Sequence, residues 1–306
     1  MVCLPVILVL AMLQAVAPVA QPKVRAWLDP DRGEPAGTHY RTFPSTLAGG
    51  EVSYLIYLPP DYQTAPQRRY PVVYWLHGRG GTPQKGAPFV RTLNDNILAG
   101  KAPAMIAVLV NGLRDSLYVD SPDGKWPVES VIIRELIPHI DRTYRTIARR
   151  DSRSVEGFSM GGYGAAHLGF KYPELFGMVG VMAGALVDCG FFMPDSSHSD
   201  VAEKLCGSDR AYWQENHPFT LLRKNADRIR GRTEIRVAVG DRDGLQRNNQ
   251  ALHELLVELK IDHEYEVVPG IEHERGRLYG TLGERAFAWY QRALRRTTSP
   301  DKRVTN

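Results

Sequence analysis

The sequence predicts an α/β fold in which a mainly parallel central sheet carries helices on both faces. Strand and helix patterns alternate from about residue 50 to residue 295, which is typical of parallel strands joined by crossover helices. Residues 105–110 are entirely apolar, as expected for a central strand covered on both faces. The chain has no internal repeat and no linker that could separate two domains, so residues 21–296 are expected to form one domain.

The expected strands are short runs rich in β-branched or aromatic side chains. They lie at residues 52–58, 72–76, 105–110, 154–155, 178–182, 235–239 and 265–268. Residues 128–144 place apolar side chains at three- and four-residue spacing, which predicts a helix with one apolar face. Residues 162–171, 245–259 and 282–294 are expected to form further helices.

The charge balance argues against a nucleic-acid-binding protein. The chain has 38 basic and 34 acidic residues, a formal net charge of +4, and 43% hydrophobic residues. Its arginine-rich stretches, at 149–150, 228–232 and 295–296, are not interleaved with aromatic side chains as a nucleic-acid surface would be. We interpret them as solvated charges on helix ends and loops.

The first twenty residues predict a secretory signal. Residues 1–20 carry no charged side chain and hold an apolar run at 6–13, followed by small residues, which favours a cleaved signal over a membrane-spanning helix. A retained anchor is the alternative interpretation. The mature protein is therefore expected to be secreted or periplasmic, without stable membrane association. Residues 297–306 are polar and expected to be a flexible tail.

Cysteine usage agrees with export. Cys3 would leave with the signal, so the mature chain would hold Cys189 and Cys206. An oxidising compartment favours a disulfide between them, and two buried free thiols are the alternative.

A candidate nucleophile lies between an expected strand and an expected helix. The motif is Gly157-Phe158-Ser159-Met160-Gly161, the pattern of a nucleophile elbow. A sharp strand-to-helix turn exposes the serine, and the glycines avoid the clashes that side chains would make there. The Met160 amide, at the start of the helix, is free to donate to a developing oxyanion. A plain turn with an inert serine is the alternative.

A second glycine-rich turn supports this interpretation. The strand at 72–76 runs into His77-Gly78-Arg79-Gly80-Gly81, a position from which α/β-hydrolases supply the second oxyanion amide. We expect the Arg79 amide to serve, with the Gly80 amide as the alternative. The stretch lacks the Gly-Lys-Ser/Thr ending of a phosphate loop.

An acid and a base should follow in the order Ser, Asp, His. The strand at 235–239 leads into a loop with Asp241 and Asp243, and we favour Asp243 because it lies further into the loop. The strand at 265–268 leads to His273, the expected general base. His263 precedes that strand and His253 lies within a helix, so both are weaker candidates.

These residues predict acyl transfer through a covalent serine intermediate. His273 would take the Ser159 proton, Asp243 would orient the imidazole, and Ser159 would attack an ester carbonyl. This chemistry needs no cofactor, and the chain has no His-Glu-x-x-His motif or calcium loop, so no metal is expected.

Three stretches together resemble the bacterial putative esterase family. They are Ser116-Leu-Tyr-Val-Asp-Ser-Pro-Asp-Gly124, Glu135-Leu-Ile-Pro-His-Ile-Asp-Arg-Thr-Tyr-Arg-Thr146 and Gly157-Phe-Ser-Met-Gly-Gly-Tyr-Gly-Ala165. The family includes feruloyl and acetylxylan esterases, S-formylglutathione hydrolases and, more distantly, mycolyltransferases. The resemblance covers roughly residues 40–295 and implies an α/β-hydrolase fold. It also implies the same triad, Ser159, Asp243 and His273, with the amides of Arg79 and Met160.

Three functions fit this resemblance to different degrees. The favoured one is an ester hydrolase acting on short-chain or carbohydrate-linked acyl or feruloyl esters. An acyltransferase would use the same triad with a sugar hydroxyl in place of water. A non-catalytic binding protein would be expected to lack a triad residue, and this chain has all three. Residues 187–225 depart from the family pattern, and we expect them to form the substrate wall.

Overall fold

The protein is built around one eight-stranded sheet. The computed structural model describes residues 27–30, 32–187 and 210–298. The strand order is β1-β2-β4-β3-β5-β6-β7-β8, with β2 antiparallel to β1 and β4 and all other pairs parallel. The strands are β1 (Thr38–Ser45), β2 (Gly50–Tyr57), β3 (Val72–Leu76), β4 (Ile106–Val110), β5 (Arg153–Phe158), β6 (Met178–Met182), β7 (Glu234–Gly240) and β8 (Glu264–Val268).

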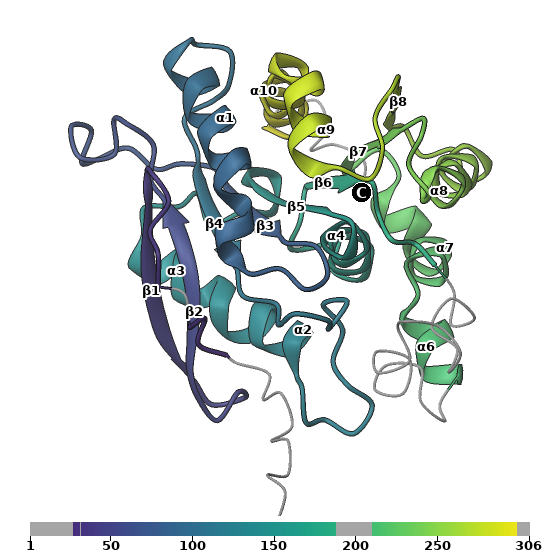
Figure 1. Cartoon of the computed structure of the whole chain (residues 1–306), viewed down its shortest axis with the longest axis horizontal. Coiled ribbons are helices and arrows are strands. Elements are labelled where there is room, and N and C mark those ends of the chain that lie inside the picture. Colours follow the sequence, from purple (N-terminus) through teal and green to yellow (C-terminus); the bar gives the residue numbers. More distant parts are fainter. Residues whose placement is uncertain (1–26, 31, 188–209, 299–306) are drawn as a thin grey trace, which may run out of the picture.

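Helices cover both faces of this sheet (Figure 1). Every residue of β3, β4 and β6 is buried, which explains why these strands are apolar along their whole length. The helices are α1 (Ala87–Leu98), α2 (Val128–Ser130), α3 (Ile137–Thr143), α4 (Met160–Lys171), α6 (Arg210–Asn216), α7 (Pro218–Ile229), α8 (Gln246–Glu258), α9 (Arg275–Leu282) and α10 (Glu284–Thr298).

The two faces have separate apolar cores. Side chains of α1, α9 and α10 pack together on one face, around Trp75, Phe89 and Phe287. Side chains of α3, α4, α7 and α8 pack on the other, around Val155, Leu168 and Leu222. Figure 1 shows α1, α9 and α10 gathered on one side of the sheet. The predicted α/β layering with a mainly parallel sheet is therefore confirmed.

The carboxyl ends of the parallel strands meet at one edge of the sheet. There β3 leads into His77, β5 into Ser159, β7 into the loop with Asp243, and β8 into the loop with His273. Ligands of open α/β sheets bind at such an edge. The fold therefore brings together four segments that are far apart in the sequence.

Several elements differ from the sequence predictions. Helices α1, α6, α7 and α9 lie in segments for which no helix was predicted, and the helix expected at 282–294 forms as α10. The edge strand β1 was not expected, because its sequence THYRTFPS is largely polar and contains Pro44. The helix expected at 128–144 forms, but residues Val131–Leu136 are π-helical, and the Ile137 amide donates to the Ile132 carbonyl. Pro138 follows directly and has no N–H for the regular helical pattern, which accounts for the wider turn before it.

The predicted ends of the chain are only partly described. The expected signal, residues 1–20, and residues 299–306 lie outside the described part, whereas α10 continues to Thr298. No helix within the described ranges is long and apolar enough to span a membrane.

Candidate active site

Ser159 lies in a strained turn between β5 and α4. Its backbone has φ 60° and ψ −117°, a conformation that non-glycine residues rarely adopt. A Cβ on Gly157 would lie 2.3 Å from the Gly161 carbonyl oxygen, and one on Gly161 would lie 2.0 Å from the Leu76 carbonyl oxygen. Both glycines are therefore required by the close approach of backbone, as expected for a nucleophile elbow.

His273 bridges Ser159 and Asp243. Its Nε2 lies 2.9 Å from Ser159 Oγ, and its Nδ1 lies 2.8 Å from Asp243 Oδ2. Because a carboxylate only accepts, Nδ1 carries the proton and Nε2 accepts from the serine hydroxyl. The ring packs on Phe158 with centroids 4.8 Å apart. The structure thus brings together the three residues predicted as a triad.

Asp243 is buried and fixed by its own loop. Its side chain is 1% exposed, whereas that of His273 is 39% exposed. Asp243 Oδ1 accepts the Leu245 amide at 2.8 Å, which leaves Oδ2 for the histidine. A buried acceptor beside an accessible imidazole suits a residue that orients the ring while the ring exchanges protons.

The competing residues have other partners. Asp241 Oδ1 accepts the Gly270 amide at 2.7 Å, so this carboxylate fixes the turn before His273. His253 Nδ1 and His263 Nε2 lie 2.7 Å apart, so the two imidazoles bond to each other. The geometry therefore favours Asp243 and His273 over these alternatives.

The glycine-rich turn after β3 lies directly against Ser159. A Cβ on Gly78 would be 3.4 Å from the Ser159 Cβ. The Gly80 amide donates to the Arg114 carbonyl at 2.6 Å, and Arg114 Nη2 donates to the Gly80 carbonyl at 2.8 Å. The Gly80 amide, the alternative oxyanion donor, therefore already has an acceptor.

The backbone amides of Met160 and Arg79 remain the predicted oxyanion donors. Met160 is the first residue of α4, where an N–H group has no acceptor within the helix. Arg79 lies between Gly78, which contacts Ser159, and Gly80, which is bonded to Arg114. Both amides lie in the segments that flank Ser159.

Two buried residues, whose structural roles were not predicted from the sequence, support this turn. His77 is fully buried, and its Nδ1 lies 2.9 Å from the Gly78 carbonyl oxygen. Burial lowers the pKa of His77 to about 4, so the ring is neutral at pH 7 and donates from Nδ1. The Tyr118 hydroxyl donates to the His77 carbonyl at 3.0 Å.

Glycines make room for the Tyr118 ring. A Cβ on Gly112 would lie 1.9 Å from that ring, and one on Gly164 would lie 2.4 Å from it. Tyr118 itself has φ 62°. In the sequence, Gly112 stands out because it closely follows β4. The sequence does not reveal which aromatic ring this glycine or Gly164 accommodates.

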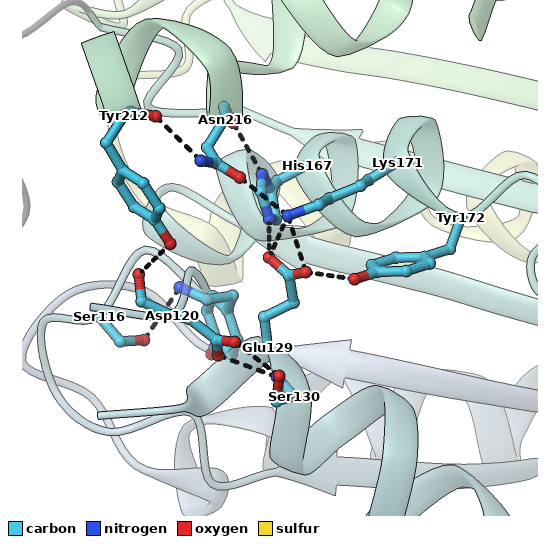
Figure 2. Close-up of polar contacts among 10 residues, drawn as sticks. Ser116, Asp120, Glu129, Ser130, His167, Lys171, Tyr172, Tyr212 and Asn216 are labelled. Atoms are coloured by element: carbon cyan, nitrogen blue, oxygen red, sulfur yellow. Dashed lines mark hydrogen bonds and ion pairs between the residues drawn. The ribbon is translucent and has the colours of Figure 1, made fainter. Parts of the chain in front are cut away.

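A buried polar cluster ties α2, α4 and α6 together on the face that holds α4. Figure 2 shows Glu129 at its centre, with His167 Nε2 2.6 Å from Oε2 and Lys171 Nζ 2.8 Å from Oε1. The Tyr172 hydroxyl also donates to Glu129. Burial opposes ionisation of this carboxylate, but the hydrogen bonds and charges of His167 and Lys171 outweigh it and lower the pKa of Glu129 to about 2.

The described part of the predicted substrate wall is attached to this cluster. His167 Nδ1 lies 2.8 Å from the Asn216 carbonyl oxygen, and the Tyr212 hydroxyl donates to the Asp120 carbonyl at 2.8 Å (Figure 2). Trp213 is 3% exposed and stacks on Tyr163. These aromatic side chains anchor α6 to the fold. Within the expected wall, residues 188–209 and both cysteines, Cys189 and Cys206, lie outside the described residues.

The last residues of the segment 187–225, from Pro218 on, form the first part of the helix that follows α6. This helix, α7, runs from Pro218 to Ile229, connects to β7 and packs against α4. It is a covering helix of the sheet. No group of three or more histidine, cysteine, aspartate or glutamate side chains that could hold a metal is present among residues 27–30, 32–187 and 210–298.

Parts of the chain are similar in sequence to proteins that are named as esterases. Esterase Rv1288 of Mycobacterium tuberculosis is 36% identical over 148 residues, which are 47% of this chain and 31% of that protein. An endo-1,4-beta-xylanase/feruloyl esterase of Xylanibacter ruminicola is 34% identical over 174 residues, which are 53% of this chain and 23% of that protein. The chain therefore spans less than a third of the length of these two relatives.

Solved structures have the same fold. A ferulic acid esterase superposes with a TM-score of 0.71 at 22% identity, covering 84% of this chain and 98% of that one. An S-formylglutathione hydrolase from Agrobacterium tumefaciens gives a TM-score of 0.67 at 20% identity, covering 84% and 95%. The predicted α/β-hydrolase fold is thereby confirmed. The family model described as "Putative esterase" matches residues 45–298, so the chain belongs to the putative esterase family.

Proposed function

We propose that the chain is a serine carboxylic ester hydrolase in which Ser159, His273 and Asp243 form the catalytic triad. The observation that carries this proposal is the continuous hydrogen-bonded path from Asp243 through His273 to Ser159, with distances of 2.8 and 2.9 Å. Both distances lie in the range of a functional nucleophile and base. Membership of the esterase family agrees with this chemistry.

Acylation would begin at Ser159 Oγ. His273 Nε2 takes the hydroxyl proton while Oγ attacks the ester carbonyl carbon, and the negative charge of the intermediate develops on the former carbonyl oxygen. The Arg79 and Met160 amides would donate to that oxygen, and each donor is worth roughly 3 kcal/mol of transition-state stabilisation. The protonated His273 then gives its proton to the leaving alcohol.

Deacylation would reverse the roles with water. His273 Nε2 takes a proton from water, whose oxygen attacks the acyl carbon. The bond between the acyl carbon and Ser159 Oγ then breaks, Oγ takes the proton back from His273, and the acid leaves. Asp243 stabilises the imidazolium in both halves of the reaction. The chemistry needs only these side chains and two backbone amides.

For the substrate, we propose short-chain or carbohydrate-linked acyl or feruloyl esters. The support comes from similar proteins, which include a feruloyl esterase among the relatives and a ferulic acid esterase among the solved structures. The partner is thus a small-molecule or carbohydrate ester. If a sugar hydroxyl replaces water at the acyl-enzyme, the same triad would make the protein an acyltransferase.

The test compares wild type with Ser159→Ala on p-nitrophenyl esters of increasing acyl length, methyl ferulate and acetylated xylan. We expect hydrolysis by wild type and a loss of roughly 10⁶-fold in kcat in the variant. Unchanged circular dichroism would show that Ser159→Ala is folded. Undiminished hydrolysis by folded Ser159→Ala would overturn the proposal, and an acylated sugar formed in the presence of an acceptor would favour the transferase.

We further propose that the protein is exported and that Cys189 and Cys206 form a disulfide. The support is the uncharged apolar segment at 1–20 and the cysteine count of the remaining chain. Mass spectrometry of protein recovered outside the cytoplasm should give a mass that lacks the first residues. A thiol titration of that denatured, unreduced protein should find no free thiol, and two thiols would refute the pairing.

A further inference from the structure

Beneath the active site, a carboxylate is buried among hydrogen-bond donors on the face that holds α1, α9 and α10. Glu156 is 0% exposed. Its Oε1 accepts the Tyr279 hydroxyl at 2.7 Å, and its Oε2 accepts Arg236 Nη2 at 2.6 Å and the Tyr290 hydroxyl at 2.9 Å. Gly180 on the neighbouring strand leaves the room, since a Cβ there would lie 2.4 Å from Glu156 Oε2.

Glu156, Arg236 and Tyr279 each lie on an element next to a residue of the candidate triad. Glu156 is on β5, three residues before Ser159, and Arg236 is on β7, seven residues before Asp243. Tyr279 is on α9, six residues after His273. The network therefore joins β5, β7 and α9, the three elements that adjoin the turns and loops with Ser159, Asp243 and His273.

A fourth element joins through an indole. Trp75 Nε1 donates to the Tyr279 hydroxyl oxygen at 3.2 Å. Trp75 lies on β3, two residues before His77, where the turn with the candidate oxyanion amides begins. The Tyr279 hydroxyl thus links α9 both to Glu156 and to the strand that leads into that turn.

The ion pair at the centre is closed off from water. Arg236 is 5% exposed, its Nη1 donates to the Ala286 carbonyl at the start of α10, and its guanidinium lies 4.6 Å from the centre of the Trp289 ring. Burial disfavours the charged guanidinium, but Glu156 and the two tyrosines outweigh that effect and raise the pKa of Arg236. A buried ion pair of this kind contributes little net stability compared with a well-packed apolar pair.

Directional hydrogen bonds, in contrast, fix the relative placement of elements. The segment that carries His273 is held on the Asp243 side by the bond between Asp241 and the Gly270 amide. On the opposite side, α9 is held through Tyr279. A displacement of about 1 Å would break the contact of His273 with Ser159, and errors of that size cost enzymes up to about 100-fold in rate.

We propose that Glu156 is a positioning residue that acts through the Tyr279 hydroxyl to hold His273 in register with Ser159. This inference rests on the proposed serine hydrolase function. It assigns to Glu156 and Tyr279 a role in the reaction although neither touches the reacting atoms. It also assigns no such role to Tyr290, which bonds to the same carboxylate from α10.

The test compares Tyr279→Phe with Tyr290→Phe. Each variant removes one hydroxyl from Glu156 and keeps the ion pair with Arg236, whereas Glu156→Gln would leave a buried charge unpaired and can prevent folding. For p-nitrophenyl acetate we expect Tyr279→Phe to lose roughly tenfold in kcat with KM within about twofold of wild type. Tyr290→Phe should keep kcat within about twofold, although both variants lower the thermal unfolding midpoint by a few degrees.

A merely structural role would lower the unfolding midpoints without separating the two kcat values. Equal kcat in the two variants, or a loss in Tyr279→Phe that falls on KM alone, would overturn the inference. The two variants can also be compared by the rate at which a fluorophosphonate labels Ser159, a measurement that needs no ester substrate. Failure of the proposed function is distinguishable, because wild type would then neither hydrolyse esters nor be labelled, and that result overturns both proposals.

Discussion

Asp243 and Asp241 lie two residues apart and bind different residues of the loop between β8 and α9. Asp243 Oδ2 accepts His273 Nδ1 at 2.8 Å, and Asp241 Oδ1 accepts the Gly270 amide at 2.7 Å. One carboxylate therefore bonds to the imidazole, and the other bonds to the backbone that precedes it. This division of contacts gives the two residues different predicted roles in the reaction.

Asp243→Asn is expected to lower kcat by about 10⁴-fold, because an amide in place of the carboxylate favours the wrong imidazole tautomer. Steady-state kinetics on the best p-nitrophenyl ester will measure the loss. Asp241→Asn is the matched control. Its side-chain oxygen can still accept the Gly270 amide, so kcat should stay within about threefold of wild type. A larger loss in Asp241→Asn than in Asp243→Asn would exchange the two assignments.

Gly161→Ala is expected to destabilise the fold by about 4 kcal/mol or more, because backbone cannot move away easily from the new methyl group. That group would lie 2.0 Å from the Leu76 carbonyl oxygen. Urea unfolding will measure the free energy.

Gly280→Ala provides the comparison, since nothing lies within 4 Å of its Cβ position in α9. It should leave the free energy of unfolding unchanged or raise it by about 0.5–1 kcal/mol. Similar losses of unfolding free energy in the two variants would contradict the interpretation that close backbone contacts require glycine at position 161.

The buried cluster around Glu129 predicts a specific loss of stability in acid. The pKa of Glu129 is about 2 in the folded protein, against an ordinary value of 4.5. A lowered pKa contributes stability that is complete above about pH 4.5 and is lost as the pH falls towards about 2. Glu129→Gln should therefore lose roughly 3 kcal/mol at neutral pH, and its stability should depend less on pH in the acid range.

Urea unfolding between about pH 6 and pH 3 will test this dependence. Glu254→Gln, on the exposed surface of α8, should follow the wild-type curve. If Glu129→Gln also runs parallel to wild type, the cluster does not contribute to acid sensitivity.

Much of the sheet could be predicted from the sequence because its central strands are buried on both faces. All strands from β2 to β8 lie where apolar or β-branched runs were expected. The edge strand β1 was missed for the same physical reason. It pairs only with β2, and half of its side chains are exposed, so its sequence does not need to be apolar.

The proximity of the three candidate triad residues was predictable from their order along the chain. Ser159, Asp243 and His273 each follow an expected strand, and parallel strands end at one edge. From the sequence, the Arg79 and Gly80 amides stay alternatives, because the bond between the Gly80 amide and the Arg114 carbonyl comes from another loop.

The burial of Arg236 and Glu156 could not be predicted from the sequence either. Arg236 interrupts an otherwise apolar strand, and Glu156 lies within the strand that leads to the elbow. Such residues are usually expected at the surface. Only the fold shows that the two meet and that two tyrosine hydroxyls also donate to the Glu156 carboxylate.

The helix that follows Ser159 has a consequence for motion. Every residue of α4 from Met160 to Phe170 is buried, whereas His273 lies on an accessible loop. Backbone amides of α4 should therefore be among the slowest in the protein to exchange with deuterium, and those flanking His273 among the faster ones. Ser159 is then the less mobile of the two residues. Thermal changes in the distance between Ser159 and His273 come mainly from movement of the loop that carries His273.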